Sequence, residues 1–315
     1  MIIKIILLIV GFMMLIKGAD VLVDGASSAA LNFKVPKMLI GLTIVAFGTS
    51  APELAVSISA RLAHSDDLVI GNVIGSSIFN ILLILGISSI IRPITVKENT
   101  IKKELPMQLI LSLLLVVLIM DITLDGNITN LITRSDALAI TLFFLIFVYY
   151  LISISKTHSL FNEKAPFGII KSLLFVIVGL AALVLGSKLV VDNATGIAHI
   201  LGISDRIIAL TIVAFGTSLP ELITSITASV KGEQDLLVGN IIGSNIFNIC
   251  VVLGIPVAIF GTIEANGFNM IDIVAFILSS VILYMFAKKR QTVGKKEGIF
   301  MVLLFILYYT LVFVI

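Results

Sequence analysis

Two glutamates stand in an otherwise apolar chain, each at the end of the same short motif. The motif is Gly-Thr-Ser-x-Pro-Glu, and it occupies Gly48–Glu53 and again Gly216–Glu221. A carboxylate inside a membrane-spanning segment costs about 2.5 kcal/mol or more, so it marks an ion or proton pathway by default. Carboxylates, hydroxyls and exposed backbone carbonyls are hard oxygen ligands, the kind that Ca²⁺ and Na⁺ prefer.

The proline of each motif predicts a broken helix. Pro52 has no N–H, so the carbonyl of Gly48, four residues earlier, loses its helical partner. Unsatisfied backbone at membrane depth is tolerated only where it lines a cavity or meets a ligand. Pro220 and Gly216 repeat this arrangement. The sequence therefore predicts that the residues around both breaks bind an ion.

Two further pairs of polar residues have the spacing of one helix face. Ser76 precedes Asn80 by four residues, and Ser244 precedes Asn248 by four residues. Together with the two motifs they predict a set of oxygen ligands: Glu53, Glu221, Asn80, Asn248, Thr49, Thr217, Ser50, Ser218, Ser76 and Ser244. Two glutamates balance the charge of one Ca²⁺ or of two Na⁺ without leaving a large buried net charge.

The motifs belong to an internal repeat that runs through the chain. Thr43–Ser50 recurs unchanged as Thr211–Ser218, and the same offset of 168 residues maps Gly71–Ile81 onto Gly239–Ile249. Paired, Gly/Pro-interrupted apolar segments in two halves of a membrane protein are the best sequence pointer to a transport site. We expect a first repeat at 1–155, a cytoplasmic linker at 156–167 and a second repeat at 168–315.

Composition sets the class of protein. Apolar residues make up 59% of the 315 residues and charged residues 13%, and the mean hydropathy is +1.19, which excludes an ordinary soluble domain. The single cysteine, Cys250, excludes disulfides and CxxC metal sites. Neither a basic patch with aromatic residues nor a phosphate-binding loop is present, so we expect no nucleic-acid partner, no nucleotide and no cofactor. We expect the apolar start to be a structural helix of the repeat and not a signal peptide, because its repeat mate lies mid-chain.

Apolar runs predict an all-α polytopic membrane protein with ten transmembrane helices. We expect them at about 2–28, 38–61, 68–91, 105–124, 136–155, 168–195, 206–230, 236–260, 268–288 and 297–315. Five helices per repeat is an odd number, so the second repeat must enter the membrane from the opposite side. The fold predicted is two inverted five-helix repeats.

The distribution of positive charge predicts the orientation. Fifteen lysines and arginines fall in loops on one side of the predicted membrane and four fall on the other, which places both termini outside the cell. We expect a multi-pass protein of the plasma membrane, surrounded by lipid and functional as a monomer. Lys17 and Lys188 are expected to reach the membrane surface or to pair with Asp20, Asp24 or Asp192, rather than with the two glutamates.

The duplicated motifs resemble the two α-repeats of the cation/Ca²⁺ exchanger superfamily, and most closely its prokaryotic sodium/calcium exchanger branch. The resemblance rests on Gly48–Glu53 and Gly216–Glu221, each followed by Gly-Asn-x-Ile-Gly-Ser-x-Ile-Phe-Asn, and it covers essentially the whole chain. It implies electrogenic exchange of Na⁺ for Ca²⁺ by alternating access, with helices 1 and 6 sliding across a rigid core that holds the ions at the midplane. Interior glycines at positions 11, 18, 179 and 186 are expected to give the sliding surfaces.

The resemblance also implies a role for each ligand. Glu53 and Glu221 correspond to the central carboxylates, and Asn80 and Asn248 complete the central site. The remaining oxygens implied are hydroxyls or carbonyls of Thr49, Ser50, Thr217 and Ser218, hydroxyls of Ser76 and Ser244, and carbonyls of Ala46 and Ala214. Archaeal and K⁺-dependent relatives often carry Asp where this chain has Asn248, which argues against K⁺ dependence.

Three other functions stay open at this stage. The first is a Ca²⁺/H⁺ exchanger, because burial raises the pKa of a glutamate and either of the two could carry a proton. The Glu-His motif typical of that branch is absent here, which favours Na⁺. The second is an ion channel, although channel filters are usually symmetric rings. The third is an intramembrane enzyme, for which no Ser/His pair, zinc motif or nucleophile elbow is found.

Overall fold

The computed structural model describes the whole chain except residues 125, 127, 156–163, 203–213, 266–269 and 315. It contains two compact units, each built from two separate stretches of sequence. Unit 1 comprises Met1–Pro52 and Ser155–Asn240, and unit 2 comprises Glu53–Ile154 and Ile241–Ile315. Each unit thus takes segments from both predicted repeats. The predicted linker at 156–167 lies largely outside the described residues.

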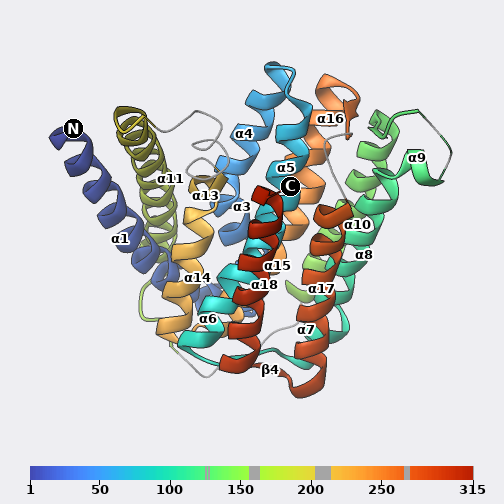
Figure 1. Cartoon of the computed structure of the whole chain (residues 1–315). Helices are drawn as coiled ribbons and strands as arrows, with labels where there is room; N and C mark the ends of the chain where they lie inside the picture. Colours follow the sequence, from blue (N-terminus) through green and yellow to red (C-terminus); the bar gives the residue numbers. More distant parts are fainter. Residues whose placement is uncertain (125, 127, 156–163, 203–213, 266–269, 315) are drawn as a thin grey trace. The chain divides into compact units, whose positions relative to one another are not determined.

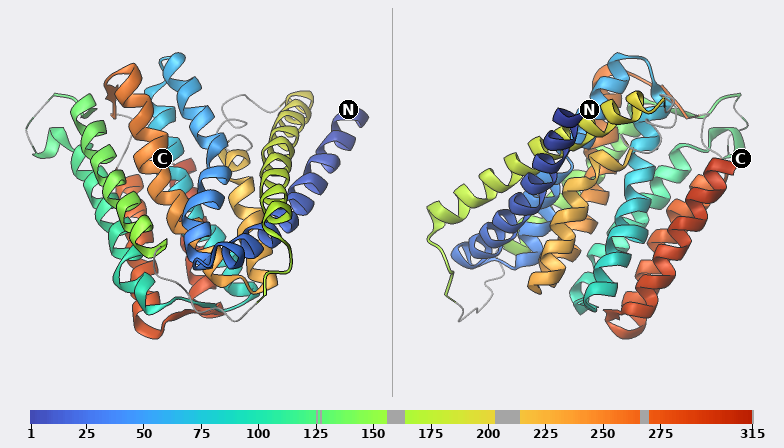
Figure 2. Two further views of the ribbon diagram at one scale, coloured as in Figure 1. Left: turned by 180° about the vertical axis from the view of Figure 1, so that it is seen from behind. Right: turned by 60° about the vertical axis from the view of Figure 1, so that its left-hand side comes forward.

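The longest helices of unit 1 are α1 (Ile2–Phe33) and α11 (Ile169–Ile200), which contain 32 residues each. They lie side by side in Figures 1 and 2. Their glycines face one another: a Cβ atom on Gly18 would lie 3.1 Å from the carbonyl oxygen of Gly179, and one on Gly186 would lie 2.9 Å from that of Gly11. The expectation that these glycines form a sliding surface against other helices is therefore wrong, because their missing side chains let α1 and α11 approach each other closely.

Both predicted helix breaks are present. In the first copy α2 (Lys37–Ile40), a π-helical turn η1 (Gly41–Val45) and α3 (Ala46–Thr49) lead to Ser50, after which α4 (Ala51–Leu62) begins. In the second copy α13 (Ala214–Thr217) leads to Ser218, and α14 (Leu219–Lys231) follows. The prolines lie just after the breaks, in the first turn of α4 and of α14. Because an N–H at that position has no helical acceptor, its absence costs little there.

The third helix of each copy also contains a matching irregularity. The first copy runs as α5 (Asp66–Ile78), the π-helix η2 (Phe79–Leu85) and α6 (Gly86–Ile91). The second runs as α15 (Gln234–Phe247), the π-helix η4 (Asn248–Leu253) and α16 (Gly254–Phe260). Such π-helical segments frequently occur at functional sites, and these two hold Asn80 and Asn248.

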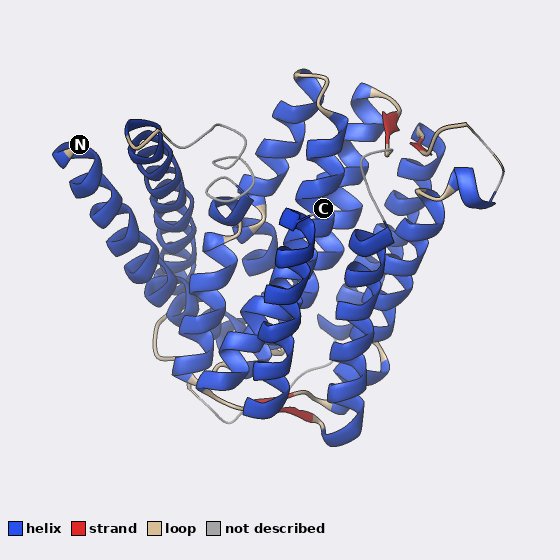
Figure 3. Ribbon diagram, viewed as in Figure 1, coloured by secondary structure: helices blue, strands red, loops and turns tan. Residues whose placement is uncertain are grey.

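The other helices of unit 2 form its outer part. They are α7 (Glu98–Lys102), α8 (Glu104–Leu118), α9 (Asp121–Leu124), α10 (Arg134–Ser155), α17 (Met270–Arg290) and α18 (Lys295–Val314). Two short antiparallel pairs tie loops together, as Figure 3 shows: β1 (Ile94–Thr95) with β4 (Thr292–Val293), and β2 (Leu131–Ile132) with β3 (Ile263–Glu264). These strands were not predicted, because two-residue strands leave no periodic signal.

Each of the ten predicted segments is mainly helical over its described residues, with breaks such as those at Ser50 and Ser218. In the part of the chain that the structure describes, six helices are long and apolar enough to cross a membrane, and the bent pair Lys37–Thr49 with Ala51–Leu62 adds a seventh if it is counted as one span. Large apolar side chains such as Ile6, Leu142 and Leu174 are exposed along α1, α10 and α11. Apolar surface of this extent marks a site of interaction with a membrane or with another protein.

Candidate functional site

The first half of the candidate site lies in unit 1 and joins the two copies directly. The Oγ of Ser50, at the first helix break, donates a hydrogen bond to Oε1 of Glu221, in the first turn of α14, at 2.8 Å. Both side chains are buried, with 0% and 1% of their surface exposed. Two predicted ligands that are 171 residues apart in sequence thus meet in the folded chain.

Thr49 completes a second contact between the copies in unit 1. Its Oγ1 lies 3.2 Å from Oδ1 of Asn240, and Asn240 in turn donates through Nδ2 to Oγ of Ser225 at 3.2 Å. Asn240 and Ser225 were not among the predicted site residues. Their repeat mates Asn72 and Ser57 lie at the same offset of 168, so the repeat itself carried a signal for them.

The carbonyl that Pro220 releases is satisfied by a serine. The oxygen of Gly216 accepts a hydrogen bond from Oγ of Ser187, on α11, at 2.6 Å. The sequence indicated that this carbonyl loses its helical partner and lines a cavity or meets a ligand. The partner in this structure is a hydroxyl of another helix.

The second half of the candidate site lies in unit 2 and begins with Glu53. Its side chain is fully buried. Its backbone carbonyl accepts a hydrogen bond at 2.9 Å from Nδ2 of Asn72, which also donates to Oγ of Ser57 at 3.0 Å. The Asn72–Ser57 pair repeats the Asn240–Ser225 pair of unit 1, so each copy uses the same bond to join the helix after the break to the next helix.

Amide side chains dominate the rest of unit 2's half-site. Asn248 donates through Nδ2 to Oγ of Ser76 at 2.8 Å, and Asn80 donates to Oδ1 of Asn245 at 3.0 Å. The buried oxygens that have no hydrogen-bond partner among the described residues include three of the predicted ligands: Oδ1 of Asn80, Oδ1 of Asn248 and Oγ of Ser244. An unsatisfied buried polar atom costs about 1–3 kcal/mol, so these oxygens fit a site that binds a cation.

The other predicted ligands are placed as follows. Ser218 and Thr217 are buried at the second break, and Ala46 is buried in α3. Ala214 begins α13, but its side chain lies outside the described residues. In total, unit 1 holds Ala46, Thr49, Ser50, Ala214, Thr217, Ser218 and Glu221, and unit 2 holds Glu53, Ser76, Asn80, Ser244 and Asn248.

The donor chemistry of both halves is that of hard cations. Every predicted ligand offers oxygen, from a carboxylate, an amide, a hydroxyl or a backbone carbonyl. Within the described part of the chain, no group of three or more His, Cys, Asp or Glu side chains could hold a metal ion. Neutral oxygens with few carboxylates suit Ca²⁺ and Na⁺ better than transition metals, which prefer nitrogen and sulfur.

Comparison with known proteins decides the family. The model of the family described as sodium/calcium exchanger protein matches residues 3–153 and 171–314, nearly the full length. This chain belongs to the sodium/calcium exchanger protein family. It is a multi-pass, all-α membrane protein, as the sequence predicted, and the family resemblance drawn from the duplicated motifs is confirmed.

Similar members of the family match along almost their whole length. The chain is 38% identical to the putative antiporter CaxA of Alkalimonas amylolytica, with 99% of each chain covered. It is 29% identical to the sodium/calcium exchanger MaX1 of Methanosarcina acetivorans, with 98% and 97% covered. Among solved structures, the sodium-calcium exchanger NCX_Mj soaked with Na⁺ and without Ca²⁺ is 32% identical, with a TM-score of 0.87 and 98% of each chain covered.

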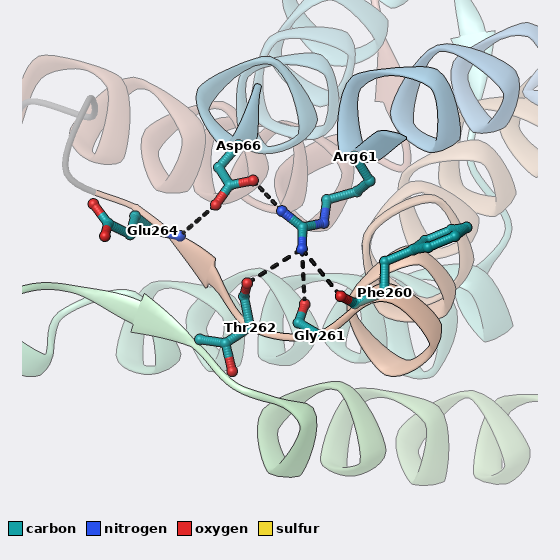
Figure 4. A network of polar contacts seen from close by, with 6 residues as sticks. All are labelled: Arg61, Asp66, Phe260, Gly261, Thr262 and Glu264. Atoms are coloured by element: carbon teal, nitrogen blue, oxygen red, sulfur yellow. Dashed lines mark hydrogen bonds and ion pairs between the residues drawn. The ribbon is translucent and has the colours of Figure 1, made fainter. Parts of the chain in front are cut away.

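A buried arginine in this exchanger-family chain is not apparent from the sequence, where it is one of the charges counted in the loops. Arg61, at the end of α4, is 8% exposed. Figure 4 shows its guanidinium paired with Asp66 and pointing at the carbonyls of Phe260, Gly261 and Thr262, which end α16. Carbonyls at a helix C-terminus carry partial negative charge, so a cation stabilises them. The contact joins the turn between α4 and α5 to the second copy.

Proposed function

We propose that this chain is a secondary antiporter that exchanges Na⁺ for Ca²⁺ across the plasma membrane by alternating access. Its site, near the membrane midplane between the two repeats, would use Glu53 and Glu221 as the charged ligands. The observation that carries the proposal is the pairing of duplicated, buried oxygen ligands with membership of an exchanger family. The names of MaX1 and NCX_Mj, both sodium/calcium exchangers, support the choice of ions.

Charge balance explains why one site can serve both ions. Two carboxylates neutralise one Ca²⁺ or two Na⁺, and the neutral oxygens of Asn80, Asn248, Thr49 and Ser50 replace lost hydration without adding charge. Unpaired charge in a low-dielectric interior costs several kcal/mol. A site that is neutral when either cargo is bound, and charged when empty, therefore favours movement across the membrane only when an ion is present.

Alternating access also needs a part that moves. α1 and α11 are the candidates, because they contact each other along their glycines. Hydrogen bonds reinforce this pair: Asn32 on α1 donates to Oγ of Ser172 on α11 at 3.1 Å, and Ser172 donates to Oγ of Ser28 at 2.9 Å. We infer that the two helices move as one body. A bound ion shifts the equilibrium between the inward-open and outward-open states only if it binds the two states with different affinities.

The proposed orientation of the chain in the membrane rests on the distribution of lysines and arginines among its loops. Fifteen basic residues on one side against four on the other support a cytoplasmic position for the basic loops and an extracellular position for both termini. Since one chain already carries both copies of the ligand set, a monomer is sufficient for transport.

The second candidate is a Ca²⁺/H⁺ exchanger that uses the same glutamates. The observation that favours it is that Glu53 and Glu221 are both buried carboxyl groups, which can carry a proton in place of a metal ion. The experiment that separates the candidates is uptake of radioactive Ca²⁺ into proteoliposomes that contain the purified full chain. One set of vesicles is loaded with Na⁺ and diluted into Na⁺-free buffer, and another carries only a pH gradient.

We expect rapid Ca²⁺ uptake in the Na⁺-loaded vesicles and only background uptake with the pH gradient alone. The reverse result would establish proton exchange in place of Na⁺ exchange. Ca²⁺ entry that needs neither gradient would indicate a channel. Glu53→Gln protein in the same vesicles gives the background that any leak produces.

A further inference from the structure

The hydroxyl of Ser187 donates its hydrogen bond to a neighbouring helix and not to its own helix. A serine inside a helix usually donates to the carbonyl four residues earlier, which here is that of Leu183. In this structure Oγ donates to the carbonyl oxygen of Gly216 at 2.6 Å, and the residue is 3% exposed. The role of this short, buried hydrogen bond therefore depends on the group that accepts it.

The partner is the carbonyl that the second helix break releases. Pro220 has no N–H to give to Gly216, so this oxygen would otherwise lack its helical donor. It lies one residue before Thr217 and five before Glu221, in the stretch that holds the proposed ligands. A backbone carbonyl at such a break is itself a potential ligand for Ca²⁺ or Na⁺.

The first copy lacks this arrangement. Gly48 and Pro52 reproduce the same break, but the residue that corresponds to Ser187 is Ala19, which has no hydroxyl. The glycines at both breaks approach α11: a Cβ atom on Gly48 would lie 2.4 Å from a methyl of Leu180, and one on Gly216 would lie 2.1 Å from a methyl of Val191. α11 therefore contacts both breaks and donates a hydroxyl to one.

We propose that Ser187 is a positioning residue that caps the Gly216 carbonyl while α11 is in the observed position, and that displacement of α11 releases this oxygen to coordinate the transported cation. The inference rests on the proposed function, because it assigns a ligand of the same site and links it to the helix that moves. It makes the site asymmetric: movement of α11 changes the number of ligand oxygens in the second copy and not in the first.

The test compares Ser187→Ala with wild type by thermal melting of the purified protein, with and without Ca²⁺. Removal of the hydroxyl leaves a buried carbonyl without its donor, so the Ca²⁺-free protein should melt at a lower temperature. Ca²⁺ can then take the oxygen, so the upward shift in melting temperature caused by Ca²⁺ should exceed that of wild type. Titration calorimetry should give about fivefold tighter Ca²⁺ binding, the factor that corresponds to one hydrogen bond of about 1 kcal/mol.

Two controls separate capping from simple structural loss. Ser172→Ala removes another buried hydroxyl from α11, one that bonds at the far end of the helix, and it should lower the melting temperature without changing the Ca²⁺-dependent shift. Ser187→Thr retains a hydroxyl and should restore wild-type Ca²⁺ affinity. If Ser187→Ala does not fold, Ser187→Cys, which is nearly isosteric and a weak donor, serves in its place.

A Ca²⁺-dependent shift in Ser187→Ala equal to that of wild type, or smaller, would overturn the proposal and make the bond a structural one. That failure is distinct from failure of the proposed function, which would appear as wild-type protein that Ca²⁺ does not stabilise at all.

Discussion

At the break in the first copy Ser50 has φ −84° and ψ 8°, and at the break in the second copy Ser218 has φ −87° and ψ 6°. The Asn–Ser bond that follows each break measures 3.0 Å in the first copy and 3.2 Å in the second. The backbone framework of the two copies is thus nearly the same. Helix breaks of this kind depend on glycine and proline, which both copies retain.

The side chains around the same framework have different partners. Asn248 donates to Ser76, whereas Asn80 donates to Asn245 and not to Ser244, the residue that corresponds to Ser76. The two copies differ here at one position. The residue that corresponds to Asn245 is Ser77, which donates to the carbonyl of Val73 on its own helix. A symmetric backbone therefore holds an asymmetric set of polar contacts, and the two copies are not interchangeable.

The same contrast appears among the charged residues of unit 1. Lys231, at the end of α14, pairs with Asp24 of α1 at 2.7 Å and with Asp20 at 3.3 Å. Pairing of Asp20 and Asp24 with Lys17 or Lys188 is therefore not what the structure shows. The other expectations for these lysines, pairing with Asp192 or a position at the membrane surface, stay predictions. In the other copy Asp192 corresponds to Asp24, but the position of Lys231 is taken by Ala63, which cannot form the ion pair.

The largest effect on transport is expected from the buried glutamate that each copy contains. Glu53→Gln and Glu221→Gln should each abolish Ca²⁺ transport, because either change leaves a bound Ca²⁺ half-neutralised in a low-dielectric site. Transport is measured as Na⁺-driven Ca²⁺ uptake into proteoliposomes, and folding is checked by melting temperature and extraction. Glu233→Gln, which alters a partly exposed ion pair with Lys37, serves as the matched control and should keep its transport. Near-wild-type uptake by either glutamine variant at position 53 or 221 would remove that residue from the site.

The second largest effect is expected from a cross-link that fixes α11, one of the two helices proposed to move. A Cβ atom at position 216 would lie 3.4 Å from Cβ of Val191, close to the roughly 3.5–4.5 Å found in disulfides. A disulfide formed in Gly216→Cys with Val191→Cys, in a Cys250→Ala background, should stop exchange while Ca²⁺ binding survives, and reduction should restore exchange. The measurement is exchange rate before and after reduction.

A second cross-link, between α1 and α11, serves as the control for the first. A Cβ atom at position 11 would lie 3.1 Å from Cβ of Leu189, so Gly11→Cys with Leu189→Cys would join α1 to α11. Under the proposed joint motion of the two helices, this disulfide should leave exchange almost unchanged. Exchange that continues at the same rate with α11 linked to position 216 would show that α11 does not move relative to the second break.

An intermediate effect is expected from Asn248→Asp. Asn and Asp have nearly the same shape, so the melting temperature should change little. The new carboxylate is buried, and it must be protonated or matched by another cation. Ca²⁺ transport should then depend more steeply on pH, or gain a dependence on K⁺. A pH profile and ion selectivity identical to wild type would show that this amide lies outside the site.

Sequence alone predicted the class of protein, the ten helices and the pairing of the breaks, because an exact repeat and apolar runs are local signals. It also predicted that residues such as Ser50 and Glu221 come together. It did not reveal Asn72 and Asn240, whose role depends on the hydrogen bonds that the helix breaks create. The π-helices at Asn80 and Asn248 were missed, since they interrupt apolar stretches without changing their composition. Long-range ion pairs such as Lys231 with Asp24 depend on tertiary packing.

The smallest effect is expected from Lys231→Gln. Its ion pairs are partly exposed, with 26% of the lysine side chain accessible, and such pairs contribute about 0.2–1 kcal/mol. The melting temperature should fall by a few degrees at low salt and by less at high salt, where exposed charges are screened. Lys102→Gln, which removes a much more exposed pair with Glu98, should have no measurable effect. A large loss that is insensitive to salt would mean that Lys231 acts through more than its charge.

The central claim is that the two copies supply one carboxylate each to a single cation. The most direct measurement is a crystal structure of the wild-type protein soaked with Ca²⁺, with the ion located by anomalous scattering. We predict one Ca²⁺ bound by carboxylate oxygens of both Glu53 and Glu221 at about 2.3–2.6 Å, the usual range for this ion. A Ca²⁺ bound by only one of these glutamates, or bound at a place that neither of them reaches, would contradict the account.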